Sequence, residues 1–177
     1  MDNTFEQIKK TILDMKKVDQ EMRNSPNIDW DELTKIDQKH TNILKEVVEK
    51  YGLIDIPRFG EEISKSAWLI VQHAPKSDIE FMEKYLYLML SHQDKVSPKN
   101  TALLEDRVNM YLGKPQVYGS QIKSNSEGKM EFYSIENIQE VDKRRFFVGL
   151  DTLANYAKRF SPEVVLPKDY KPDPNYS

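Results

Sequence analysis

Apolar residues recur with helical spacing through the first two thirds of the chain. One amphipathic stretch covers about residues 3–23, and a second covers about residues 29–51, where Gly52 is placed to end it. Residues 61–74, around Trp68, are apolar on nearly every side, which is typical of a helix surrounded by protein. The pattern therefore predicts an antiparallel pair of long helices and a buried central helix.

Capping signals predict two more helices in this region. Ser77 and Glu80 have the spacing of a capping box, which would start one helix. Ser97 followed by Pro98 would start another, over residues 98–112, because proline is favoured in the first turn. These signals bring the number of expected helices before residue 113 to five.

The pattern changes after residue 115. Residues 116–123 and 129–135 are β-prone runs joined by a polar loop with glycine, which predicts a hairpin. Two short helices should follow, with Asn137 and Asp151 as their N-caps. We expect a mainly α (α+β) fold of about six to seven helices around a buried central helix, with one small β-hairpin near residues 116–135.

The C-terminal residues contain a cluster of prolines at positions 162, 167, 172 and 174, too many for regular structure. No internal repeat or interdomain linker is evident before them. The sequence therefore predicts a single globular helical domain over residues 1–160 and a proline-rich tail over residues 161–177.

Composition excludes several classes of function. The chain has no cysteine, which excludes disulfides, thiolate nucleophiles and cysteine-bound metals, and three histidines make a dedicated transition-metal site unexpected. Carboxylate-bound magnesium stays open. The net charge of −3 gives no pull toward nucleic acid. No apolar run approaches the roughly 20 residues of a membrane helix, and the N-terminus does not read as a signal peptide, so we expect a cytoplasmic protein without membrane or nucleic-acid partners.

Polar residues on apolar helix faces are the first candidates for a site. Asp19 falls between Met15 and Met22, with Arg23 four residues on and within reach for a pair. His40 interrupts the inward face of the second helix in the same way. The favoured interpretation of Asp19 and His40 is a core polar group with satisfied hydrogen bonds.

Gln72 and His73 end the most hydrophobic helix, so they deliver two hydrogen-bonding side chains at the edge of the core. A neutral imidazole at His73 can act as general acid or base. It can equally cap the helix end by binding carbonyl groups. The sequence does not separate these two interpretations.

The fifth helix carries Asp106 and Arg107, which as neighbours point about 100° apart and need separate partners. We expect a structural ion pair for Arg107, with an anionic ligand as the alternative. In the following run, Tyr118 and Gln121 lie close to Gly119 in the sequence. A glycine here would allow a ligand to approach the backbone closely, but it is equally compatible with an ordinary twisted hairpin.

A basic run, residues 143–145, precedes Phe146 and Phe147. We interpret it as a solvated face followed by two core aromatic residues, with one arginine free to turn inward toward an acidic partner or phosphate. Standard phosphate-binding, zinc-protease, nucleophile-elbow and calcium motifs are missing.

Several short motifs of the sequence together resemble those of a family of bacterial domains of unknown function. The motifs are Trp68, Gln72-His73-Ala74, Asp106-Arg107 and Tyr118-Gly119-Ser120-Gln121. The similarity extends from Asp19 to about Phe160. The family usually has Tyr-Gly-Thr-Gln, so Ser120 is a departure that keeps the hydroxyl, and Leu53-Ile54 stands where Trp-Pro is common. The resemblance implies that His73, Asp106, Arg107, Tyr118 and Gln121 converge on one site, and it names no reaction.

Two hypotheses of different classes follow, and whether the chain is an enzyme stays open. In the first, a pocket performs hydrolase- or transferase-type acid–base chemistry on a small anionic substrate. Its predicted residues are the catalytic pair His73 and Asp106 and the ligand-binding residues Gln72, Arg107, Tyr118 and Gln121, with no metal and with any cofactor unidentified. The alternative is a non-catalytic helical module that binds a protein partner or neutralises a toxin.

Overall fold

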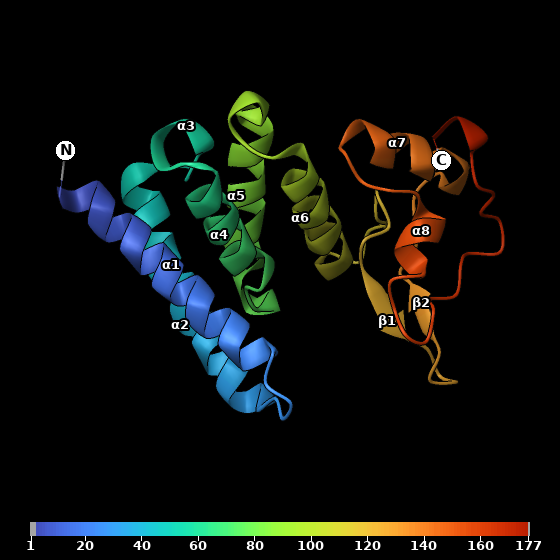
Figure 1. Cartoon of the computed structure of the whole chain (residues 1–177), viewed down its shortest axis with the longest axis horizontal. Coiled ribbons are helices and arrows are strands. Elements are labelled where there is room, and N and C mark those ends of the chain that lie inside the picture. Colours follow the sequence, from blue (N-terminus) through green and yellow to red (C-terminus); the bar gives the residue numbers. More distant parts are fainter. Residues whose placement is uncertain (1–2, 177) are drawn as a thin grey trace. The chain divides into compact units, whose positions relative to one another are not determined.

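The computed structural model describes residues 3–176, and its contacts divide the chain into two compact units, residues 1–100 and 101–177. Residues 1, 2 and 177, which the predicted domain and tail include, lie outside the described part. The described residues form eight α-helices, six of them seven residues or longer, and one two-stranded antiparallel hairpin (Figure 1). This confirms the predicted mainly helical class with one hairpin.

The first unit is a bundle of helices around α4. Its α-helices are α1 (Asn3–Arg23), α2 (Trp30–Tyr51), α3 (Ile56–Phe59), α4 (Glu61–Gln72) and α5 (Ile79–Ser91). In Figure 1, α1 and α2 lie side by side, and α4 contacts α1, α2, α3 and α5. The predicted central helix is therefore confirmed, and the apolar faces of its neighbours cover it.

Local signals explain where most of these helices begin and end. The Asp29 side chain accepts hydrogen bonds from the backbone N–H groups of Asp31 and Glu32 at the start of α2. Gly52 ends α2 with a φ of 73°, a conformation that disfavours other residues. The predicted capping box of Ser77 and Glu80 is wrong, because Ser77 lies inside a 3₁₀ turn, Lys76–Asp78, that precedes α5.

Helix α6 (Pro98–Tyr111) begins as the sequence predicts. The hydroxyl oxygen of Ser97 accepts a hydrogen bond from the backbone N–H of Asn100 at 3.3 Å, which satisfies one of the donors that a helix start leaves unpaired. Gly113 follows the helix with a φ of 71°, so the expected end is confirmed as well.

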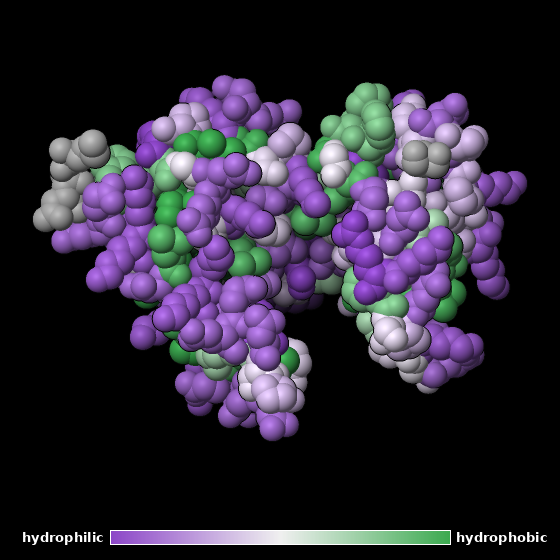
Figure 2. Space-filling model, viewed as in Figure 1, coloured by the Kyte–Doolittle hydropathy of each residue, from purple (hydrophilic) through white to green (hydrophobic). Residues whose placement is uncertain are grey.

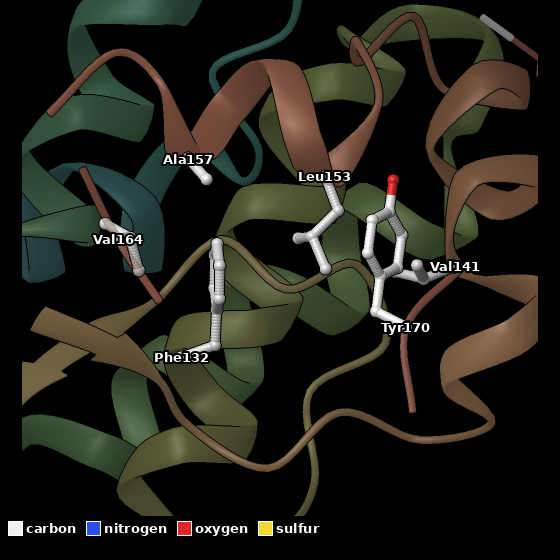
Figure 3. Packing of buried hydrophobic residues seen from close by; sticks show 6 residues of the cluster. All are labelled: Phe132, Val141, Leu153, Ala157, Val164 and Tyr170. Atoms are coloured by element: carbon white, nitrogen blue, oxygen red, sulfur yellow. The ribbon is translucent and has the colours of Figure 1, made fainter. Parts of the chain in front are cut away.

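The second unit combines a small hairpin with two short helices. These elements are β1 (Ile122–Ser124), β2 (Met130–Phe132), α7 (Val141–Phe147) and α8 (Leu153–Ala157), and Lys123 pairs with Glu131 in the antiparallel register. Figure 3 shows the buried cluster that joins them, made of Phe132, Val141, Leu153, Ala157, Val164 and Tyr170. Val164 and Tyr170 come from the proline-rich C-terminal residues, which thus contribute to this core.

Two details of the predicted second half are wrong. Asn137 makes no side-chain cap, and a 3₁₀ turn, Ile138–Glu140, comes before α7. Thr152, and not Asp151, caps α8, because its hydroxyl oxygen accepts the backbone N–H of Asn155. Asp151 instead binds two arginine side chains.

The two phenylalanines of α7 are not core residues. Phe146 and Phe147 are 56% and 71% exposed, and their rings contact each other and the ring of Tyr176. A hydrophobic surface is visible over α7 in Figure 2. The short α7 directs its buried face through Val141 and Arg145, which leaves the two rings on the opposite side.

None of the helices within residues 3–176 has the length and apolarity needed to span a bilayer. Over the same residues, His, Asp and Glu side chains form no group of three or more suited to hold a metal ion.

Candidate functional site

The predicted site residues are divided between the two units. Two of them, Gln72 and His73, end α4 in the first unit, and the second unit holds the others: Asp106, Arg107, Tyr118 and Gln121. Each group has its own network of contacts within its unit. The prediction that all six share one pocket therefore stays a prediction.

The carboxylate of Asp19 is the centre of a polar cluster in the first unit. Asp19 is fully buried on the inward face of α1. Its Oδ1 lies 2.8 Å from Nδ1 of His73 and accepts a hydrogen bond from Nε of Arg23 at 2.9 Å, while Oδ2 accepts one from Nε2 of Gln20 at 2.8 Å. The structure confirms the predicted pairing of Asp19 with Arg23 and adds His73, which is 54 residues distant in sequence.

Arg23 connects this cluster to a second carboxylate that sequence reasoning missed. Its Nη2 donates to both oxygens of Asp37 on α2 at 2.7 Å. Asp37 lies one turn from Leu33 and Thr41 on the inward face of α2, and this position was the available signal. With His73 neutral, two carboxylates and one guanidinium leave the cluster with one excess negative charge.

The ionisation of Asp19 determines which ring nitrogen of His73 carries the proton in their contact. Burial by itself would raise the pKa of Asp19, but the hydrogen bond and charge of His73, with the hydrogen bonds of Gln20 and Arg23, lower that pKa to about 2. Asp19 is therefore ionised at neutral pH and only accepts hydrogen bonds. Nδ1 of His73 must carry the proton in this contact, so Nε2 is the basic nitrogen of the neutral ring.

The second ring nitrogen of His73, Nε2, forms no hydrogen bond with any residue in the described range, and the side chain is 19% exposed. The alternative interpretation of His73, a ring that caps helix carbonyls, is wrong: only its backbone N–H closes the helix, donating to the carbonyl of Leu69 at 3.1 Å. The ring is held in place by Asp19 through Nδ1.

Three buried polar atoms of the first unit have no hydrogen-bond partner in the part of the chain that is described. They are Nδ1 of His40, Nε1 of Trp68 and Oε1 of Gln72. The prediction that His40 is a satisfied core residue is therefore wrong, and burial lowers the pKa of its imidazole, which favours the neutral ring. Buried polar atoms without protein partners are rare in native proteins, which makes these three positions notable within the core of the first unit.

Asp106 has a clear structural task in the second unit. Fully buried on α6, it accepts hydrogen bonds from the backbone N–H groups of Val117 and Tyr118 through Oδ1, and from that of Ser120 through Oδ2, all within 2.8–2.9 Å. Burial raises its pKa, with the hydrogen bonds of the loop acting in the opposite direction. The carboxylate thus holds the main chain of residues 117–120.

The same loop is held from its other side, which explains why residues 116–121 are not the predicted strand. The carbonyl of Tyr118 accepts from Nη1 of the buried Arg145 at 2.7 Å, and that of Ser120 accepts from the hydroxyl of Tyr156 at 2.9 Å. The Gln116 side chain binds both main-chain groups of Gln121. Because side chains occupy main-chain groups of residues 117–120, backbone pairing with residues 133–136 is found only at the two ends of the loop, Gln116 and Gln121.

Arg145 is therefore the arginine of the basic run that turns inward. Its guanidinium binds backbone carbonyl groups and Asp151, so its burial is explained without a bound phosphate group. Gln121 uses its amide nitrogen on the hydroxyl oxygen of Ser120 at 2.9 Å. Tyr118 is half-buried, and burial raises the pKa of its phenol. These contacts stabilise a rigid loop.

Arg107 differs from the other buried groups of the second unit. Its guanidinium lies 5.9 Å from the ring of Tyr111, its Nε is buried without a partner, and it forms no ion pair within residues 3–176. The expected structural ion pair of Arg107 is therefore wrong. A guanidinium without a counter-ion is compatible with the alternative, an anionic ligand.

The sequence model of a family of unknown function, DUF6624, matches residues 6–165, so the chain belongs to that family. No curated protein and no solved structure matches it.

Proposed function

We propose that the first unit is an acid–base site that binds a small polar molecule and exchanges a proton with it through His73. The observation that carries the proposal is the 2.8 Å contact between Nδ1 of His73 and the buried, ionised Asp19. A carboxylate in this position selects the tautomer with a basic Nε2 and stabilises the imidazolium that forms when Nε2 takes a proton.

The roles follow from this geometry. Nε2 of His73 removes a proton from the bound molecule and returns one to the leaving group, as hydrolase- and transferase-type reactions require. Asp19 is a positioning residue, because it acts through the imidazole. Arg23 holds Asp19 and Asp37 together and so stabilises the arrangement.

The remaining predicted site residues lie in the second unit, and the acid–base role proposed for the first unit does not depend on them. Asp106 and Gln121 support the loop of residues 116–121, and we propose structural roles for them in place of catalysis. Arg107, which forms no ion pair within residues 3–176, stays a predicted binding residue for an anionic ligand of the second unit. Tyr118 stays a predicted ligand-binding residue.

A turnover screen tests the proposal. The purified chain is incubated with mixtures of amides, esters and phosphorylated metabolites, and mass spectrometry identifies any compound that is consumed. We expect His73→Asn to lower the rate of consumption by roughly 10²- to 10⁴-fold, the usual contribution of one general acid–base group. His92→Asn is the matched control, because the His92 ring only binds the carbonyl of Leu88 within its own helix end.

A His73→Asn protein that is folded and turns over the compound as fast as the unaltered chain would refute the proposal. So would equal losses in the His73→Asn and His92→Asn variants.

We keep the protein-interaction module as a second candidate, because Phe146 and Phe147 expose an aromatic surface on α7. Exposed apolar patches often mark contacts between proteins. The test is Phe146→Ser with Phe147→Ser: a specific partner must be retained by the unaltered chain and lost by the double variant. A partner retained equally by both would remove this surface from consideration.

A further inference from the structure

Trp68 and Gln72 form an unusual pair at the end of α4. They are 8% and 7% exposed, and each has one buried polar atom without a partner among residues 3–176: the donor Nε1 of Trp68 and the acceptor Oε1 of Gln72. The other buried positions of α4 are mostly apolar, so packing of the helix does not by itself require these two hydrogen-bonding groups.

Their spacing brings the two groups to one place. Residues four apart lie above one another on the same side of an α-helix, with Cβ atoms about 5–6 Å apart. Both side chains therefore start from one side of α4, immediately before His73 in the sequence. A ligand that satisfies both must carry an acceptor and a donor side by side.

The charge of the neighbouring cluster limits the kind of group that fits. His73 contacts Asp19, and Arg23 is shared between Asp19 and Asp37, so the cluster has one excess negative charge when His73 is neutral. A carboxylate or phosphate at this end of α4 would be repelled while His73 is neutral, and in either state of His73 it would offer no donor to Oε1 of Gln72. A neutral group avoids both penalties.

We propose that the group bound by the end of α4 is a neutral amide edge, such as a lactam or a nucleobase presents, with its C=O accepting from Trp68 and its N–H donating to Gln72. This inference rests on the proposed function, for which it names the part of the substrate that lies beside His73. It concerns only the part of the ligand that lies at the end of α4, and it allows an anionic group on another part of the same molecule.

Nuclear magnetic resonance of the full chain labelled with ¹⁵N-tryptophan tests the inference. The chain has two tryptophans, and Trp30 is 66% exposed, so its indole signal is an internal control. The probes are 2-pyrrolidinone, which has both donor and acceptor, N-methyl-2-pyrrolidinone, which lacks the donor, and acetate. We expect 2-pyrrolidinone to shift the Trp68 signal saturably and the N-methyl compound to bind about tenfold more weakly, because Oε1 of Gln72 stays unpaired.

Two variants sharpen the result. Gln72→Met removes the acceptor and keeps the Trp68 signal, and it should weaken binding of 2-pyrrolidinone by a similar factor, whereas Trp30→Phe should not. If Gln72→Met does not fold, the comparison of the two pyrrolidinones still decides. The inference is overturned if no probe shifts the Trp68 signal saturably, as an enclosed water alone would give, if both pyrrolidinones bind equally, or if acetate binds as well as 2-pyrrolidinone.

The His73→Asn variant separates this inference from the proposed function. Binding of 2-pyrrolidinone should stay within about twofold in that variant while turnover is lost. Retained binding with unchanged turnover would refute the acid–base role alone. Loss of a compound's turnover in His73→Asn, together with no binding of 2-pyrrolidinone to the unaltered chain, would refute the amide edge alone.

Discussion

Replacing Asp19 by Asn should destabilise the first unit by an amount that depends on pH. The pKa of Asp19 is lowered from 3.8 to about 2 in the folded chain. At about 1.4 kcal/mol per pH unit, this difference corresponds to ~2.5 kcal/mol of stability. Because the folded pKa is the lower one, this contribution is fully present above about pH 5 and is lost as the pH falls toward 2.

Urea unfolding followed by tryptophan fluorescence is the appropriate assay. Both tryptophans, Trp30 and Trp68, lie in the first unit, so the fluorescence reports on that unit. We expect Asp19→Asn to lower the free energy of unfolding at pH 7 by about 2–3 kcal/mol, since its partners His73 and Arg23 lose an ionised acceptor. The difference from the unaltered chain should shrink steadily between about pH 5 and pH 2.

Asp14→Asn is the control, because Asp14 is exposed on the same helix and should change the free energy of unfolding by less than about 0.5 kcal/mol. A loss for Asp19→Asn no larger than that of this control would refute the stabilising role of Asp19. Equal destabilisation at pH 3 and pH 7 would also refute it, because the charge of Asp19 would then contribute nothing.

Two further substitutions address the second unit, each followed by urea unfolding monitored by far-ultraviolet circular dichroism. Gly119→Ala should lower the free energy of unfolding by about 2–4 kcal/mol, because the added Cβ would lie 2.6 Å from a side-chain atom of Ile135 and the backbone has a φ of +69°. Gly128→Ala, at a similar φ and with nothing within 4 Å, should lower it by only about 1 kcal/mol. Equal losses in the two variants would refute the steric contact as the cause. Tyr170→Phe should cost about 1.5–3 kcal/mol by removing the 2.7 Å hydrogen bond from its hydroxyl to Asp142, and a change below about 0.5 kcal/mol would refute the importance of that bond.

The long helices were predictable because their signals are local. The period of apolar residues and caps such as Ser97 and Gly52 act within a few residues, and α1, α2, α4 and α6 appear where these signals place them. The loop of residues 116–121 was not, because its conformation depends on Asp106 and on side chains from later in the chain. A β-prone composition does not reveal that side chains will occupy the main-chain hydrogen bonds.

The candidate site shows the same division. Gln72 and His73 were identifiable as polar residues at the end of an apolar helix, and the pair of Asp19 and Arg23 follows from helical spacing. That Asp19 also binds His73 depends on how α1 packs on α4, which no local pattern encodes. The tendency of aromatic residues to be buried predicts Phe146 and Phe147 in the core, yet a helix of seven residues has too little inward surface to bury both.

The proline-rich C-terminal residues are not a dispensable end. Val164 and Tyr170 are 1% and 8% exposed and lie in the same cluster as Phe132, so trimming the chain before them would open a hole in the second unit and strip Asp142 of its phenol partner. Anyone who shortens this chain to aid crystallisation, or who expects its end to tolerate proteolysis, should therefore cut beyond Tyr170.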